Sequence, residues 1–345
     1  QKELGSYAAK TTRVRELGLD LAEVVTARGG VVDAVALDEA ATLAKTDLTT
    51  ELVKEFTELQ GIVGGLYAKA QGASEAASKA IYDQYLPESM EDAVPRTIEG
   101  ALLSIADKAD TIAGMFGLGL EPTGSKDPFA LRRAANGIVK ILAEATPALP
   151  LTLSEVAGRA TPNEAVETRV RAFLVERLEF YLREAKGQAY DVVKAVLAAG
   201  SDDVRDAVAR AEAVSSVRGA SDGRGDFEAV SAAFKRMKNI LAQAKEKGET
   251  FDAPAALKET HAAQAGLAAA AAEVGDKVSV LSAAYEYRAA LESVATLRPQ
   301  VDAFFEQVMV MDPDAEVRRS RLALLASIVK SFSGIADFSE IVTAG

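Results

Sequence analysis

The sequence predicts an all-α, multi-helical protein, and three observations support this. Apolar residues recur at the three-and-four spacing of amphipathic helices, most clearly over residues 38–69 and 164–184. Alanine, the strongest helix former, is abundant along the whole chain. The β-branched run at residues 31–35 adjoins Gly29 and Gly30, so it indicates a loop that enters a helix rather than a strand.

The same spacing predicts further helices in order along the chain. Residues 101–116 form one, and the segment PFALRRAANGIVKIL, which starts at Pro128, forms another. After the helix at 164–184, the expected helices cover residues 189–199, 201–217, 227–246, 254–272, 275–297, 299–309 and 314–334. No repeat of fixed period is visible, which counts against a solenoid.

Residues 111–133, with the sequence TIAGMFGLGLEPTGSKDPFALRR, interrupt this pattern with a shaped loop. Its glycines accept positive φ angles easily, and Asp127 can cap the helix that follows. Lys126, Arg132 and Arg133 lie near that helix N-terminus, so these cations and the helix dipole could hold an anion such as phosphate. The alternative is a Gly-rich turn that only closes one helical layer over another.

This loop matches a nucleotide-binding P-loop only superficially. Gly119 and Gly124 have the required spacing, but Ser125 precedes Lys126, whereas a P-loop needs lysine before the hydroxyl residue. Pro122 interrupts the loop as well, and the segment before it is helical where a P-loop follows a strand. We therefore exclude a P-loop.

The composition indicates a folded protein of two or three domains. The chain has 345 residues, of which 49% are hydrophobic and 26% are charged. It has no cysteine, which excludes disulfides, thiolate metal sites and cysteine nucleophiles and fits a cytoplasmic location. Neither a transmembrane helix nor a signal peptide is expected, because no apolar run is long enough and no basic start precedes an apolar stretch.

Two loop-like segments suggest domain boundaries. Residues 145–152 carry two prolines after a long helix, and residues 216–227 carry three glycines among polar neighbours. This composition is typical of exposed connections. We therefore divide the chain at about residues 150 and 225, into 1–150, 151–225 and 226–345.

The net charge of −12 argues against a general nucleic-acid binder, because such binders neutralise phosphates with an excess of cations. The basic residues nevertheless cluster. RRAANGIVK carries three cations without an acid, FKRMKNILAQAKEK carries five and VRRSR adds three. Such clusters can hold a few phosphates while the acidic remainder repels other polyanions, which would give a binder that selects by shape.

The sequence offers few candidates for catalysis. His261 is the only histidine and has no cysteine or second histidine as a partner, so we expect it to face solvent on a helix. No nucleophile elbow is present, which argues against nucleophilic hydrolysis. Asp107 and Asp110 lie three residues apart on one predicted helix face and are expected to be solvated acids. We predict no catalytic residue and no metal site.

Five longer stretches stand out in order along the chain. They are AKTDLTTELVKEFTELQGIVGGLYA (44–68), LSIADKADTIAGMFGLG (103–119), PTGSKDPFALRRAANGIVKIL (122–142), FKRMKNILAQA (234–244) and RPQVDAFFEQVMVMDPDAEVRRSRLALLASIVKSFSGIADFSEI (298–341). Together they resemble the bacterial glycyl-tRNA synthetase beta subunit. The resemblance spans the chain and implies that it corresponds to the C-terminal half of that subunit.

The resemblance implies a role for each part of the chain. Residues 1–150 would have the HD-type helical fold, whose enzymes use a metal ion held by histidines and aspartates to activate water. The expected His-Asp pair is replaced by LAKTDL at 43–48, and Asp107 would be the late aspartate, so this site is degenerate. Residues 151–225 would be a helical connecting region. Residues 226–345 would form a DALR-like helical-bundle anticodon-binding domain.

The anticodon-binding part implies further tRNA contacts. Arg and Lys supply phosphate contacts, Asn can pair with a base edge, and an aromatic ring can stack on an unstacked base. Phe304, Phe305, Leu322 and Leu325 recur at helical spacing and are expected in the core, whereas the lysines and the first arginine of VRRSR are expected to face solvent. The family pattern has Asn at position 320, but this chain has Ser320. A side-chain amide at this position therefore has no role in tRNA contact here. The candidate tRNA-binding residues are Lys126, Arg132, Arg133, Lys235, Arg236, Lys238, Asn239, Arg318 and Arg321.

The function that the resemblance implies is tRNA recognition. The chain would position tRNA(Gly) for ATP-dependent glycylation catalysed with the alpha subunit, in an expected α2β2 hetero-oligomer. The whole enzyme would use ATP and Mg²⁺, whereas this part would need no cofactor and would be inactive alone. Neither a membrane nor DNA is an expected partner. The alternatives are a helical subunit-assembly scaffold without RNA contact and an HD-type metal-dependent phosphohydrolase.

Overall fold

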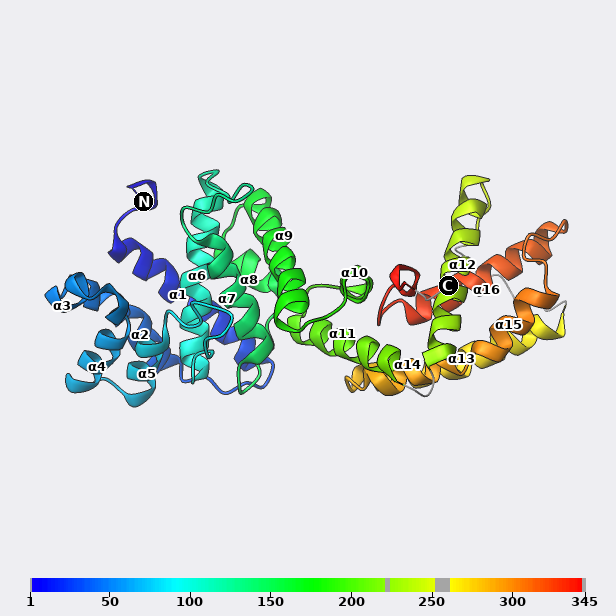
Figure 1. Ribbon diagram of the computed structural model, residues 1–345. Helices are drawn as coiled ribbons and strands as arrows, with labels where there is room; N and C mark the ends of the chain where they lie inside the picture. Colours follow the sequence, from blue (N-terminus) through cyan, green and yellow to red (C-terminus); the bar gives the residue numbers. More distant parts are fainter. Residues whose placement is uncertain (1, 221–223, 252–260, 343–345) are drawn as a thin grey trace. The chain divides into compact units, whose positions relative to one another are not determined.

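The structure, a computed structural model, describes residues 2–220, 224–251 and 261–342 and is built from α-helices (Figure 1). Over these ranges it contains no strand beyond an isolated bridge between Thr123 and Lys126, which confirms the all-α prediction. Across the same residues, none of the helices has the length and apolarity that a bilayer crossing requires. The chain forms two compact units, residues 1–185 with 202–205 (unit 1) and residues 186–201 with 206–345 (unit 2).

Helix α6 lies at the centre of unit 1. The helices of this unit are α1 (Tyr7–Ala27), α2 (Ala34–Leu43), α3 (Glu51–Glu55), α4 (Ile62–Ala70), α5 (Glu75–Asp83), α6 (Ile98–Gly117), α7 (Leu131–Glu144), α8 (Leu153–Ala160) and α9 (Glu164–Phe180). α6 packs against α1, α2, α5, α7, α8 and α9, and it is buried on nearly all sides because apolar residues surround the helix. Figure 1 shows α2–α5 gathered on one side of α6 and α7–α9 on the other.

Helix α12 organises unit 2. The helices of this unit are α10 (Tyr190–Ala199), most of α11 (Val204–Gly219), α12 (Arg224–Glu246), α13 (Ala262–Ala283), α14 (Tyr287–Ala295), α15 (Arg298–Gln307) and α16 (Ala315–Phe332). α12 packs against α14, α15, α16 and a C-terminal 3₁₀ turn. Its core includes four buried rings with centroids 5.1–6.0 Å apart, those of Phe227, Phe234, Phe332 and Phe338. Phe304, Leu322 and Leu325 are fully buried, which confirms their predicted place in the core.

Side-chain caps determine where several helices begin. Ser6 and Ser74 each accept a hydrogen bond from the backbone N–H three residues later, as does Thr97 at the start of α6. At α8, Thr152 and Glu155 form a capping box, in which each side chain accepts from the backbone N–H of the other. These caps satisfy amides that have no partner within the helix.

The single helix predicted over residues 38–69 is wrong. The segment instead contains most of α2, then α3 and α4, with 3₁₀ turns between them. Thr50 starts α3 by accepting a hydrogen bond from the N–H of Val53 at 3.3 Å. Gly61 has a φ of 78° and donates its N–H to the Asp47 carboxylate at 2.6 Å, just before α4 begins. The hydrogen bonds of Thr50 and Asp47 therefore divide this segment into short helices, although its apolar spacing is continuous.

The other predicted helices are confirmed with shifts at their ends, apart from one pair. The predictions at 101–116, 164–184, 189–199, 201–217, 227–246, 299–309 and 314–334 correspond to α6, α9, α10, α11, α12, α15 and α16. Residues 31–33 form the expected loop before α2. For the predicted pair 254–272 and 275–297, residues 254–260 lie outside the described residues. α13 continues through the predicted break, including Gly275, and ends at Ala283, because no proline interrupts its alanine-rich sequence.

The predicted boundary at about residue 150 falls between α7 and α8, whereas the one at about residue 225 falls within the first turn of α12. The compact units separate elsewhere, near residues 185 and 206. α8 and α9 pack against α6 and α7, whereas α10 packs against the turn Phe338–Glu340, so the predicted connecting region is divided between the units. The three-part division remains a prediction.

We expect Gly65→Ala to destabilise unit 1. A Cβ atom at Gly65 in α4 would lie 2.6 Å from the carbonyl oxygen of Ser78 and 2.7 Å from Cβ of Tyr82, so α4 and α5 would have to separate. Urea denaturation should show the free energy of unfolding falling by about 2 kcal/mol.

Gly266→Ala in α13 is the matched control, because a Cβ atom there meets nothing within 4 Å. Alanine at this helical position should preserve the free energy of unfolding or raise it by about 0.5–1 kcal/mol. Equal effects of the two substitutions would contradict the close approach of α4 and α5.

Candidate functional site

Asp127 organises the loop that leads into α7. One carboxylate oxygen accepts a hydrogen bond from the N–H of Leu131 at 2.8 Å, and the other accepts from the N–H of Arg132 at 2.9 Å. Ala130 adopts a left-handed conformation with a φ of 52°, and α7 begins at Leu131 rather than at Pro128 as predicted. The prediction that Asp127 caps this helix is confirmed.

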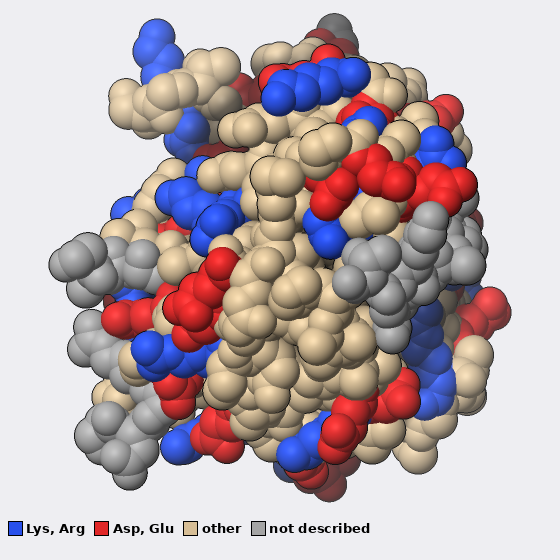
Figure 2. Space-filling model, turned by 90° about the vertical axis from the view of Figure 1, so that its right-hand side faces the viewer, with Lys and Arg blue, Asp and Glu red and all other residues tan. Residues whose placement is uncertain are grey.

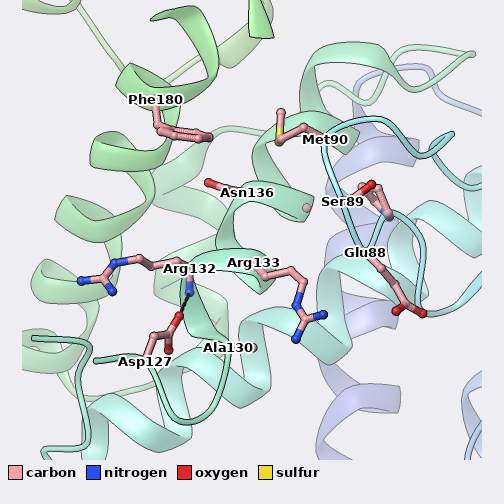
Figure 3. Close-up of a pocket in the computed structure, with 11 residues that line it drawn as sticks. Glu88, Ser89, Met90, Asp127, Ala130, Arg132, Arg133, Asn136 and Phe180 are labelled. Atoms are coloured by element: carbon pink, nitrogen blue, oxygen red, sulfur yellow. Dashed lines mark hydrogen bonds between the residues drawn. The ribbon is translucent and has the colours of Figure 1, made fainter. Parts of the chain in front are cut away.

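This cap changes the expected anion site. The first amides of α7 already bind the Asp127 carboxylate, so they are not open to an external anion. Arg132 donates to the carbonyl oxygen of Gly124 at 2.8 Å, and Figure 3 shows its side chain pointing away from that of Arg133. The predicted convergence of the helix N-terminus and these cations on one anion is therefore wrong. Lys126 and Arg133 are exposed, and the three tRNA contacts remain predictions.

A pocket of about 380 Å³ opens beside the first turns of α7 (Figure 3). Its lining comes from residues 87–90, from the start of α7 and from the end of α9, and it includes Arg132 and Arg133. Met90, Asn136 and Phe180 line it too, and the sequence analysis missed all three. They carry no motif, and they come together only because α7 packs against α9 and lies close to residues 87–90.

Two acids of α6 that were expected in solvent are buried in ion pairs. The Asp107 carboxylate lies 3.0 Å from Lys10 Nζ and 3.0 Å from Lys45 Nζ. The Asp110 carboxylate lies 3.1 Å from Lys10 Nζ and 2.6 Å from Arg13 Nε. The two aspartate side chains are only 13% and 9% exposed, so the prediction of solvated acids is wrong. Cations from α1 and from the end of α2 make burial of these acids possible.

The cations of this cluster keep Asp107 ionised. Burial alone would raise the pKa of Asp107, but the charges and hydrogen bonds of Lys45 and Lys10 outweigh burial and hold that pKa well below its usual range. On the next residue, burial lowers the pKa of Lys108 to about 8. Its ammonium group donates to Ser104 Oγ at 2.6 Å and to backbone carbonyl oxygens.

Lysine ammonium groups bind Asp107, the residue expected as the late aspartate of a degenerate HD site. Lys45, from the segment 43–48, binds Asp107, and Asp47 of the same segment binds the N–H of Gly61. The ammonium groups of Lys10 and Lys45 therefore lie where a cation such as Mg²⁺ would have to bind the Asp107 carboxylate. In the part of the chain that the structure describes, no three His, Cys, Asp or Glu side chains lie close enough together to bind a metal ion.

His261 lies at the start of a helix rather than on its face. Its Nδ1 accepts a hydrogen bond from the N–H of Ala263 at 3.2 Å, so it caps α13. The side chain is half-buried, and the prediction of a solvent-facing residue within a helix is wrong. An N-cap needs an acceptor beside the free amides, and His261 Nδ1 supplies one here.

Three candidate residues of α12 are exposed together. Lys235, Arg236 and Asn239 lie at spacings of three and four residues, which places Asn239 beside both cations on the helix surface. The Arg236 guanidinium lies 4.1 Å from the ring centroid of Phe305 on α15. That ring is half-buried, so Phe305 differs from the fully buried core residue that was predicted. We call these four residues the α12 platform.

Two other candidates are held in ion pairs. Lys238 Nζ lies 2.5 Å from the Asp337 carboxylate, and Arg318 Nε lies 2.7 Å from that of Glu249. The Arg318 side chain is only 20% exposed, so the prediction that it faces solvent is wrong, whereas the Lys238 side chain is 41% exposed beside its partner. Their partners lie 99 and 69 residues away in the sequence, so no local pattern could reveal them.

Arg321 is a structural residue. It is only 6% exposed and donates to the Asp312 carboxylate and to the carbonyl oxygen of Met309, both at 2.7 Å. These bonds hold the connection between α15 and α16, so we no longer expect Arg321 to contact phosphate. Gln264 is fully buried beside it and donates to Ser320 Oγ at 3.2 Å. Gln264 of α13 thus places a side-chain amide beside Ser320, where the family pattern has Asn.

Acidic and basic side chains are interspersed on the face of the molecule that Figure 2 shows. Lys and Arg alternate with Asp and Glu around a broad uncharged area, and no single basic area covers this face. A polyanion would therefore contact it through a few cations, because neighbouring acids repel phosphate elsewhere.

Family models match both ends of the chain. Residues 1–198 match the family described as "Glycyl-tRNA synthetase beta subunit". Residues 230–338 match the "DALR anticodon binding domain". The pocket beside α7 lies within the first match, and the α12 platform lies within the second.

Whole-chain relatives agree with these matches. A "Glycine--tRNA ligase beta subunit" of Acidobacterium capsulatum is 57% identical over 355 residues, which cover 99% of this chain and 49% of that protein. Proteins with the same description from Moorella thermoacetica and Magnetococcus marinus are 41% and 40% identical to this chain. The two alignments cover 99% and 100% of this chain, respectively, and 49% of each relative. The chain thus spans about half the length of the curated relatives it matches.

Acidification is expected to destabilise unit 1 through Asp107. Its pKa is lower in the folded than in the unfolded protein, so its stabilising contribution is complete above the usual aspartate value of about 4 and is lost as the pH falls toward the folded-state value. Asp107→Asn should lower the free energy of unfolding at neutral pH by about 3 kcal/mol, because it leaves the buried Lys45 without a carboxylate and removes one of the two carboxylates beside Lys10. It should also flatten the acid dependence measured by urea denaturation.

Asp20→Asn is the matched control, since Asp20 is exposed on the same unit. Stability at neutral pH and its acid dependence should both match the unmodified protein. The cluster would lose its assigned role if Asp107→Asn kept the full acid dependence.

Proposed function

The chain belongs to the glycyl-tRNA synthetase beta subunit family, and from this premise we propose that it is the tRNA-recognition part of a glycine–tRNA ligase. Its ligand would be tRNA(Gly), and its partner would be the alpha subunit in an α2β2 enzyme of the cytoplasm. ATP and Mg²⁺ would act in the whole enzyme, and this chain would position the RNA without catalysing the reaction itself.

The α12 platform is the observation that carries this proposal. It lies within the region that matches an anticodon-binding domain, and it combines two exposed cations with an amide and an aromatic ring. Arg236 stacked on Phe305 offers a flat cationic surface to an unstacked base. Lys235 can bind a neighbouring phosphate, and Asn239 can pair with a base edge.

The mechanism that follows from this arrangement is positional. Holding the anticodon arm fixes the orientation of the whole tRNA, so the acceptor end reaches the catalytic partner without a random search. The net charge of −12 limits the number of phosphates that the protein surface can hold. Recognition would then depend on the placement of a few cations and a stacking surface rather than on net charge.

A role in subunit assembly without RNA contact is the second candidate. Leu52 on α3, Phe56 directly after it, and Leu66 and Tyr67 on α4 are large apolar residues with 37–55% of their surface exposed. Such residues favour contact with another protein surface. The phosphohydrolase alternative has no comparable support, because the oxygens of Asp107 are bound by Lys10 and Lys45.

Charge reversal of the platform is expected to weaken tRNA binding. The double variant Lys235→Glu with Arg236→Glu should lower the affinity for tRNA(Gly) about tenfold or more, because it removes a phosphate contact and the stacked guanidinium. The slope of log affinity against log salt concentration should become less steep by about one, for the loss of one phosphate contact. Fluorescence anisotropy with labelled tRNA at several salt concentrations measures both quantities.

The matched control is Lys277→Glu with Lys330→Glu, two exposed lysines of unit 2 outside the platform. It changes the net charge by the same amount and should leave affinity and slope close to those of the unmodified chain. Equal losses in both double variants would replace the platform with general electrostatic attraction. Absence of saturable tRNA binding by the unmodified chain would favour the assembly role.

A further inference from the structure

The pocket beside α7 has the size and construction of a small-ligand site. Its volume of about 380 Å³ lies within the range of about 300–1,000 Å³ that is typical of ligand pockets. Residues 87–90, α7 and the end of α9 supply its lining, so it is formed by packed segments of unit 1 rather than by one mobile loop. The lining combines apolar side chains with one amide, one hydroxyl, two arginines and two carboxylates, those of Glu88 and Asp127.

Asn136 carries an unsatisfied polar atom in the wall of this pocket. Its Oδ1 is buried and accepts no hydrogen bond within the described part of the protein. A buried acceptor without a donor is unfavourable, so a ligand N–H that reaches it would be bound preferentially. The amide offers an acceptor next to a donor, which matches the adjacent donor and acceptor on the edge of a nucleobase.

Phe180 and Met90 form the apolar part of the pocket. In Figure 3 their side chains point toward one another, with Asn136 near the space between them. The Phe180 ring is 36% exposed, although the next two residues of the chain are buried. It lies directly before the π-helical turn Tyr181–Ala185, and such turns are frequent at functional sites. A ring and a thioether facing each other provide a slot for a flat aromatic group.

Arg133 gives the pocket an available cation. Its side chain is exposed and forms no ion pair with a described residue, and Figure 3 shows it on the side of the pocket nearer the Glu88 carboxylate. Arg132 instead donates to Gly124, and the Asp127 carboxylate is bound by helix amides. Arg133 is therefore the residue of this lining that can bind a phosphate in bidentate fashion.

We propose that this pocket binds one unstacked nucleotide, with its base between Phe180 and Met90, its base edge on Asn136 and its phosphate on Arg133. The inference extends the proposed function, because a bound tRNA is one source of such a nucleotide. A free nucleoside monophosphate is the other source. Both share the chemistry that these side chains recognise, an aromatic base joined to a phosphate.

The experiment titrates the full chain with AMP, adenosine and ribose 5-phosphate and follows binding by NMR. Asn136→Leu and Phe180→Leu should each weaken AMP and adenosine about tenfold, since both act on the base. Arg133→Ala should weaken AMP to the affinity of adenosine and leave adenosine unchanged. Ribose 5-phosphate should bind more weakly than AMP, because it lacks the base.

Arg159→Ala is the matched control, since Arg159 is an exposed arginine of unit 1 outside the pocket lining. It should leave AMP affinity unchanged. Arg133 is exposed, so its substitution keeps the test decisive even if one of the interior variants fails to fold. The proposal is overturned if AMP shows no saturable binding, or if Arg133→Ala and Arg159→Ala bind AMP equally well.

Competition with tRNA(Gly) distinguishes the two sources. Displacement of AMP by tRNA assigns the pocket to a nucleotide of the RNA, whereas simultaneous binding assigns it to a free nucleotide. Failure here is separate from failure of the proposed function, because the α12 platform is tested by variants in unit 2. If tRNA binding depends on Lys235 and Arg236 but not on the pocket, the proposed tRNA-recognition function is supported. The pocket proposal is then decided by AMP binding alone.

Discussion

Internal ion pairing decides which cations of this chain can bind a ligand. Acids outnumber Lys and Arg by 51 to 39, so a cation stays available only where the fold keeps acids away from it. Lys238 and Arg318 are paired with Asp337 and Glu249, although they belong to the same basic segments as exposed cations. The fold thus reduces broad basic segments to small surfaces such as the α12 platform.

The same constraint explains the core of unit 1. Asp107 lies mostly buried on the central helix α6, and a carboxylate can remain charged there only with cations beside it. Lys10 and Lys45 come from separate parts of the chain, so their contacts with Asp107 connect α1 and the end of α2 to α6. An acid that resembles a metal ligand in the sequence is therefore part of the packing of this unit.

The sequence predicted what depends on local pattern and failed where distant residues decide. Helix α9 follows from apolar spacing, and its N-cap Asn163 directly precedes it. The break within 38–69 depends on a bond from Gly61 to Asp47, 14 residues away, and apolar periodicity carries no information about it. The exposed cations of α12 were identified from composition and resemblance. The pocket was not, because Met90, Asn136 and Phe180 meet only after folding.

Under the two proposals, two small surfaces on an acidic protein would select a folded RNA. Each offers few unpaired cations, so each alone would hold a polyanion weakly, and the surrounding acids would repel contacts elsewhere. When two sites of one protein bind one ligand, the second contact is intramolecular, and affinity rises only for ligands that reach both. A tRNA with an unstacked nucleotide and an anticodon loop can meet this condition, whereas a plain duplex lacks both features. Weak separate contacts would in this way become selectivity for shape.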